Sequence, residues 1–157
     1  MLRIIKGDIF DAKEKYLVHQ CNCQSKKSSG IAREVFTKYP YSNIYENRNI
    51  PDKVGSICIK GNGIDRRYVI NLFGQNYPGK PSFSPFSLDS FNSREEHFKK
   101  GLFEISKLNY LESICFPWKI GCGAAGGNWE TYLEILINFA DYVNKLQQVD
   151  IIIYKKD

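Results

Sequence analysis

The sequence predicts an α/β protein in which helices cover the faces of a central sheet, and two observations lead to this. Short apolar runs typical of buried strands alternate along the chain with segments of helical periodicity. One such run, residues 114–116, leads into a glycine-rich loop and then a helix, an order in which α/β proteins bind phosphate groups. With 157 residues and 43% hydrophobic content, the chain can bury one continuous core, so we expect a single domain over residues 1–157 with a three-layer α/β/α architecture.

Six short apolar segments read as strands. They are residues 2–5, 16–20, 54–60, 68–73, 114–116 and 149–154. The second continues into Cys21-Asn22-Cys23. Residues 61–65, Gly-Asn-Gly-Ile-Asp, predict a hairpin turn between the third and fourth strands.

Three segments have helical periodicity. The first opens at Gly30 and stops at Pro40, which cannot continue a helix. The second is predicted to start at a capping box made by Ser93 and Glu96. The third, residues 129–147, follows Asn128, a good N-cap residue. Residues 74–89 are rich in proline, glycine and serine, and a loop of that length is usually functional or disordered.

Composition and charge indicate in which compartment the protein works and which class of ligand it favours. Five cysteines without disulfide-framework spacing predict a reducing compartment, so we expect a cytoplasmic protein, with the nucleus as a second location. No apolar run is long enough to span a membrane, and the first residues lack the apolar stretch of a signal peptide. A net charge of +5 favours anionic ligands weakly; because the basic residues are scattered, it does not by itself indicate nucleic-acid binding.

The loop at residues 121–127 is the strongest candidate for a binding site. Its four glycines and two alanines leave backbone N–H groups uncovered, and the helix after Asn128 adds the positive end of its dipole. An ordinary glycine-rich turn without a ligand is the alternative. The spacing is neither a Walker loop nor a dinucleotide G-x-G-x-x-G.

Three unusual stretches follow predicted strands: residues 7–9, 22–30 and 121–127. Ligands of such sheets bind beyond the carboxyl ends of the strands, so one cleft would collect all three.

These stretches, in this order, resemble the macrodomain family, which binds ADP-ribose, and the resemblance spans essentially the whole chain. It implies a mixed, mostly parallel sheet with helices on both faces. Asp8 would accept a hydrogen bond from the adenine amino group, Asn22 would hold the distal ribose, and Tyr154 would pack against adenine. The ligand-binding residues that the resemblance implies are Asp8, Ile9, Asn22, Gly30, Ile31, Ala32, Gly121, Cys122, Gly123, Ala124, Ala125, Gly126 and Tyr154.

Within the family, residues 17–23, Gly30-Ile-Ala and Tyr39-Pro40 resemble the ADP-ribose 1″-phosphate phosphatase branch. That branch removes the terminal phosphate of a by-product of tRNA splicing. The resemblance implies that His19 acts as general acid/base on the leaving sugar hydroxyl while Asn22 orients the ribose. From the sequence alone, a core histidine is the alternative.

Two other activities stay open. The loop also resembles a branch that removes ADP-ribose from proteins or nucleic acids, but Gln75 and Ala125 stand where that branch has a lysine and an aspartate, which leaves Lys80 in the 74–89 loop as the candidate lysine. A non-catalytic module that binds free ADP-ribose or ADP-ribosylated macromolecules is the third possibility. We expect a monomer that does not bind membranes.

No metal or cofactor is expected. His19, Cys21 and Cys23 do not have zinc-site spacing, and buried structural cysteines are the simpler interpretation. Cys122 lies near a helix start, which would favour its thiolate, but the loop lacks the arginine of cysteine phosphatases. Asp89 is a weaker candidate for a supporting acid than for a surface or capping residue.

Overall fold

A computed structural model describes residues 2–156, in which six strands form one sheet in the order β1-β6-β5-β2-β4-β3. The strands are β1 (Leu2–Lys6), β2 (Tyr16–Asn22), β3 (Ile57–Lys60), β4 (Tyr68–Gln75), β5 (Ser113–Pro117) and β6 (Asp150–Lys155). Only β3 is antiparallel to its neighbour; the other four pairings are parallel. The expected mixed, mostly parallel sheet is confirmed.

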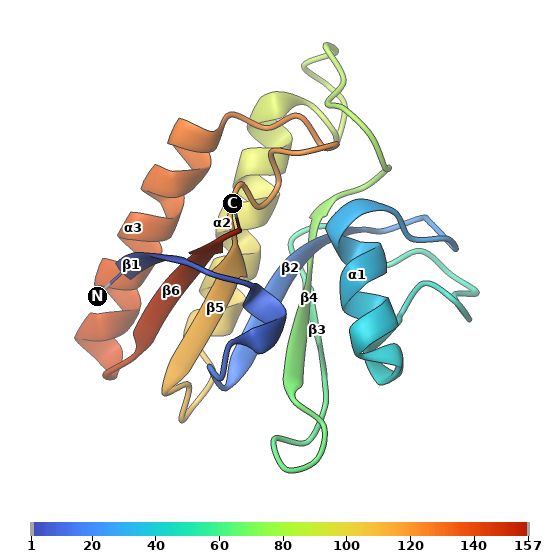
Figure 1. The fold of residues 1–157 in the computed structure, drawn as a ribbon. Coiled ribbons are helices and arrows are strands. Elements are labelled where there is room, and N and C mark those ends of the chain that lie inside the picture. The colour runs from blue at the N-terminus through green and yellow to red at the C-terminus, as the bar shows by residue number, and fades with distance from the viewer. Residues whose placement is uncertain (1, 157) are drawn as a thin grey trace.

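Helices cover both faces of this sheet (Figure 1). On one face lie α1 (Gly30–Lys38) and the short 3-10 helix η1 (Ile9–Asp11), and on the other lie α2 (Phe91–Ser106) and α3 (Trp129–Leu146). A second 3-10 turn, η2 (Pro40–Ser42), follows α1. The three-layer α/β/α architecture is therefore also confirmed. Among residues 2–156, no helix combines the length and apolar character needed to cross a membrane.

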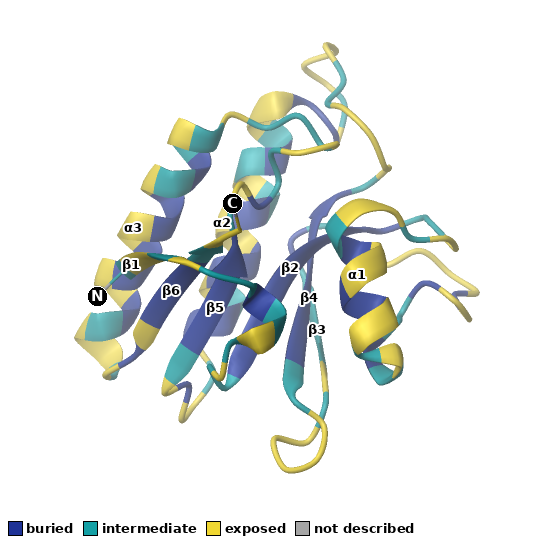
Figure 2. Ribbon diagram, viewed as in Figure 1, coloured by how far each residue is buried: buried dark blue, intermediate teal, exposed yellow. Residues whose placement is uncertain are grey.

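Two apolar layers, one on each side of the sheet, make the core (Figure 2). Strand β2 shows how the alternation of side chains divides them. Leu17 and Cys21 pack under α1, whereas Val18 packs against the layer that α2 and α3 cover. All seven residues of β2 are buried, because helices cover both of its faces.

The helix starts differ from expectation in one place. Helix α2 begins at Phe91, and the side chain of Ser90 accepts the N–H of Ser93 at 3.0 Å. The predicted capping box at Ser93 and Glu96 is therefore wrong, because the cap lies one turn earlier. The predicted cap of α3 is confirmed: the Asn128 side chain accepts the N–H of Thr131 at 3.2 Å.

Close packing of α2 on β4 predicts the effect of Gly101→Ala. A Cβ at Gly101 would lie 2.5 Å from Cγ of the buried Leu72. From helix propensity alone, replacing glycine by alanine would stabilise the protein by about 1 kcal/mol. Overpacking costs about 1–3 kcal/mol, so we expect the free energy of unfolding to fall by up to about 2 kcal/mol in urea denaturation. Lys99→Ala, on the exposed side of α2, is the control, and a more stable Gly101→Ala protein would contradict the packing.

Candidate functional site

A cleft of about 590 Å³ opens at the carboxyl ends of β2, β4 and β5. Four segments form its walls: the turn after β2, the start of α1, the loop after β4 and the glycine loop after β5. Eight of the predicted site residues line it: Asn22, Gly30, Ile31, Ala32, Gly121, Gly123, Ala124 and Ala125. The structure thus brings together two of the three stretches that the sequence singled out.

Hydrogen bonds fix the backbone N–H, the backbone carbonyl and the side-chain oxygen of Asn22. Its Oδ1 accepts the backbone N–H groups of Gln24 at 3.0 Å and Ser25 at 2.8 Å. Its N–H donates to the Tyr45 hydroxyl at 2.8 Å, and its carbonyl accepts from Arg48 Nη2 at 3.0 Å. The Nδ2 amide group donates to none of residues 2–156 and is available for an acceptor on a ligand.

The glycine loop has free donors in the middle and bonded donors at its edges. The N–H groups of Cys122, Gly126 and Gly127 close turns within the loop. Those of Gly123, Ala124 and Ala125 donate to no acceptor in the described part of the chain. Consecutive free N–H groups near a helix start are an arrangement that suits an anion.

Two glycines of this loop serve different purposes. Gly121 has a φ of 76°, and a Cβ on it would lie 2.6 Å from the Tyr132 ring, so a larger residue would displace the loop. A Cβ on Gly123 would meet no atom within 4 Å, so this position is open toward the cleft that it lines. Gly121 therefore shapes the loop, whereas Gly123 leaves room for a ligand.

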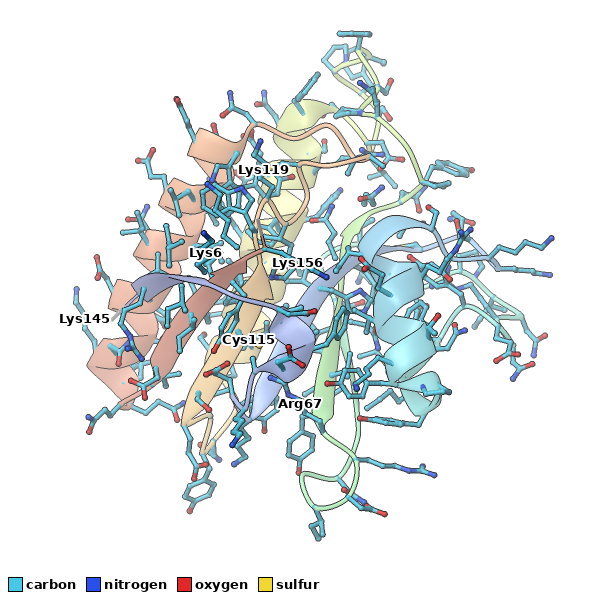
Figure 3. The ribbon with its side chains drawn as sticks, in the orientation of Figure 1. Lys6, Arg67, Cys115, Lys119, Lys145 and Lys156 are labelled. Carbon is cyan, nitrogen blue, oxygen red and sulfur yellow. The ribbon has the colours of Figure 1, made fainter. Side chains whose placement is uncertain are left out.

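Lys119 adds positive charge to the same cleft. It is exposed, lines the cleft and forms no ion pair with another described residue (Figure 3). Together with the free N–H groups, it gives this wall the character of an anion site.

The residues predicted to bind adenine lie beyond this cleft, at the ends of β1 and β6. Asp8 Oδ1 accepts the N–H of Phe10 at 2.9 Å and caps η1. This bond, helped by Lys156 Nζ at 3.3 Å from Oδ2, lowers the pKa of Asp8. The side chain of Ile9 is buried in the core. The Asp8 side chain, in contrast, remains partly accessible.

Tyr154 connects this end to the cleft. Its hydroxyl donates to Glu14 Oε2 at 3.0 Å, and a Cβ on Gly7 would lie 3.6 Å from its ring. Its carbonyl accepts the N–H of Trp118, a cleft residue, at 3.0 Å. The Asp8 and Tyr154 end is therefore continuous with the cleft, although neither residue lines it.

His19 lies outside the cleft and inside the core. It is fully buried, its Nε2–H donates to Asn71 Oδ1 at 2.6 Å, and its ring meets Phe36 edge-on. Burial lowers its pKa to about 4, so the imidazole is neutral and has no path to a ligand. This placement agrees with the core histidine that the sequence left open and does not support general acid/base chemistry by His19.

Two other side chains differ from expectation. Burial raises the pKa of the Cys122 thiol to about 12, so the thiolate expected near the helix start is absent. Asp89 is buried in a salt bridge with Arg94 and does not enter the cleft as an acid. In the part of the chain that the structure describes, no three histidine, cysteine, aspartate or glutamate side chains are grouped as metal ligands.

Several polar and aromatic residues around the cleft were not among the residues that the sequence predicts for the site. Gln20 and Gln75 form its floor, joined by a hydrogen bond of 2.7 Å from Nε2 to Oε1. Trp118 lines it from the end of β5. Arg94 lies behind two of its walls. Gln20 ends a predicted strand, and Gln75 and Trp118 follow predicted strands, which is the signal that would have found them. Arg94 lies within α2 and has no such signal.

The buried imidazole predicts a specific loss of stability in acid. Because its pKa is about 4 when folded and 6.5 ordinarily, the unfolded chain binds the proton first as the pH falls. Stability is therefore lost between about pH 6.5 and 4, by about 2 kcal/mol at pH 5. We expect His19→Gln to be less stable at pH 7.5 but to lose less stability between pH 7.5 and 5 in urea denaturation. Equal losses in both proteins would contradict this.

No protein-family model matches the chain. An uncharacterized protein of Saccharolobus solfataricus is 27% identical over 162 residues, which covers 98% of this chain and 85% of that protein. The macrodomain of Mycobacterium tuberculosis DarG superposes with a TM-score of 0.75 at 23% identity, over 98% of this chain and 97% of that one. A Trypanosoma brucei macrodomain, solved in complex with ADP-ribose, superposes with a TM-score of 0.69 at 12% identity, over 99% and 63%. The chain has the macrodomain fold.

Proposed function

We propose that the chain binds ADP-ribose, with the diphosphate and the distal ribose in the 590 Å³ cleft. One observation carries the proposal: the free N–H groups of residues 123–125 and the free amide of Asn22 line the same cleft. N–H groups suit the oxygens of a diphosphate, and an amide NH2 suits a ribose hydroxyl. The Trypanosoma brucei macrodomain of the same fold was solved with ADP-ribose, which supports this choice of ligand.

The position of the diphosphate determines the direction in which the adenosine part would extend. With the diphosphate on the glycine loop, the adenosine would extend past Trp118 toward Tyr154 and Asp8, since Trp118 and Tyr154 are joined through their backbones. Asp8 has a partly exposed carboxylate there, which suits the adenine amino group. The net charge of +5 and the unpaired Lys119 favour a ligand with two phosphates.

The finer activity that we propose is hydrolytic removal of the group attached at the 1″ position of the distal ribose, and two substrates are the candidates. In ADP-ribose 1″-phosphate, water attacks phosphorus, the bond to the 1″ oxygen breaks, and the sugar hydroxyl leaves with a proton. With His19 sealed in the core, the groups in the cleft for this reaction are Asn22 and the loop N–H groups. They orient the ribose and stabilise negative charge, but neither transfers a proton readily.

One observation favours the second substrate, a macromolecule carrying ADP-ribose. Lys80 lies against the glycine loop: a Cβ on Gly126 would be 3.4 Å from its Cγ. Lys80 is exposed, so its side chain can rotate to bring the amine toward a ligand on the glycine loop. In this second reaction, the amine of Lys80 would be the nucleophile.

Gly123→Val tests the binding proposal. The free protein has space for the added side chain, so its unfolding temperature should change by less than about 2 °C. The isopropyl group would cover the free N–H groups, and the loss of one or two bonds to a charged oxygen lowers affinity for ADP-ribose about 10- to 100-fold. Isothermal titration calorimetry measures both proteins. Thr37→Val on the exposed side of α1 is the matched control, and undiminished affinity in Gly123→Val would overturn the site.

Lys80→Met separates the activities. We expect removal of ADP-ribose from an ADP-ribosylated polypeptide or oligonucleotide to slow about 100-fold, with the dissociation constant for ADP-ribose changed less than about twofold. Phosphate release from ADP-ribose 1″-phosphate that persists in Lys80→Met would instead identify a phosphatase. Binding of ADP-ribose with neither reaction would identify a non-catalytic binding module.

A further inference from the structure

Arg94 is buried in α2, behind the walls of the cleft. It is 2% exposed and is one of the largest fully buried side chains of the protein. Removing a guanidinium from water costs several kcal/mol unless its donors are paired. The acceptors that compensate for this cost show which segments Arg94 holds in place.

Four of its five N–H donors are paired, and the acceptors come from two different loops. Nε donates to Asp89 Oδ1 at 3.0 Å, and Nη2 donates to the carbonyl of Tyr77 at 3.0 Å. Nη1 donates to the carbonyls of Gly79 at 2.7 Å and Ala125 at 3.1 Å. Three acceptors lie in the loop between β4 and α2, and the fourth lies in the glycine loop between β5 and α3.

Asp89 completes the attachment of the first loop. Its two oxygens accept the backbone N–H groups of Asn76 at 2.8 Å and Tyr77 at 3.0 Å. The carboxylate therefore ties the end of this loop to its beginning, and Arg94 ties both to α2. We call Arg94 and Asp89, with these bonds, the brace.

The brace reaches the floor of the cleft. The Tyr77 carbonyl that accepts from Arg94 also accepts from Gln75 Nε2 at 2.9 Å, and Gln75 Oε1 accepts from Gln20. Gln20 lies against the start of the glycine loop, since a Cβ on Gly121 would be 3.0 Å from its Oε1. Floor and walls thus belong to one hydrogen-bonded network.

Gly79 and Ala125 line the cleft from two different walls. In Figure 1 the loop after β4 and the glycine loop approach each other above the sheet, where Arg94 joins them. A single nitrogen, Nη1, bonds to both carbonyls, so the separation of the two walls is set by one planar, rigid group.

We propose that Arg94 is a positioning residue that fixes the width of the cleft between these two walls. The inference rests on the proposed ADP-ribose binding and deepens it. The parts of the ligand between the walls, the diphosphate and the distal ribose, depend on the brace. The adenosine part, which would lie toward β6, does not. Lysine cannot replace arginine here, because an ammonium lacks the planar fork that reaches both loops.

The test compares two ligands in Arg94→Lys and Arg94→Met by calorimetry. AMP has the adenosine part but lacks the second phosphate and the distal ribose. We expect affinity for ADP-ribose to fall about tenfold or more, as for loss of a correctly placed bond to a charged group, and affinity for AMP to change less than about twofold. A loss of general stability would weaken both ligands alike, so the ratio of the two affinities is the diagnostic quantity.

Arg67→Met is the matched control. Arg67 also bonds to backbone carbonyls, those of Ile9 and Glu14, but it lies close to η1 and away from both walls (Figure 3). We expect no selective loss of ADP-ribose in this variant. Hydrogen exchange adds a second measurement: amides 76 and 77 should exchange faster in Arg94→Met, while those of the buried strand β2 should not.

Each outcome is decisive. If Arg94→Met does not fold, Asp89→Asn, which weakens the same brace with a side chain of equal size, takes its place. A wild-type protein that binds no ADP-ribose overturns the proposed function. A wild-type protein that binds ADP-ribose, with variants that lose neither ligand or lose both equally, overturns the role of Arg94 alone.

Discussion

Parallel pairing of β2 with both β4 and β5 is the constraint on which the remaining structure depends. It places three strand ends side by side, and the loops that leave them become the walls of one cleft. The same pairing buries every residue of β2, so the polar residues of this strand must find partners inside the protein. His19 finds Asn71 and Gln20 finds Gln75, both on β4. The strand thus determines which of its side chains belong to the core and which belong to the site.

Features that depend on residues close together in the sequence could be predicted. Asn128 caps its helix because its side chain bonds within one turn, and the glycine loop is open because its residues are small. Partners distant in sequence were not predictable. Arg94 has no local sequence signal that marks its role, because its bond to Ala125 spans 31 residues. His19 lies in the segment that resembles the phosphatase branch, but it is three residues inside the end of β2, where the core buries it completely.

The fold and the chemistry of this cleft are separate questions. In the proposed function, the donors to the diphosphate and the ribose are backbone N–H groups and one asparagine, which any member of such a fold can retain whether or not it catalyses a reaction. A reaction needs in addition a group that moves a proton or attacks a bond. The buried imidazole of His19 and the protonated thiol of Cys122 do not provide one. Lys80, exposed on an adjoining loop, is the candidate of the proposed hydrolase reaction, so that under this proposal the chemistry depends on a loop rather than on the sheet.

The sheet order has a consequence for how the protein folds. Strand β1 pairs with β6, so that Leu2 lies opposite Ile151. This is among the longest separations that the chain permits, and contacts of this kind form slowly because a large loop must close first. Asp8 follows β1 directly, whereas the glycine loop is framed by β5 and α3, which are neighbours in sequence. We expect the glycine-loop end of the cleft to form early in folding and the end near Asp8 to be completed last, when β1 joins the edge of the sheet.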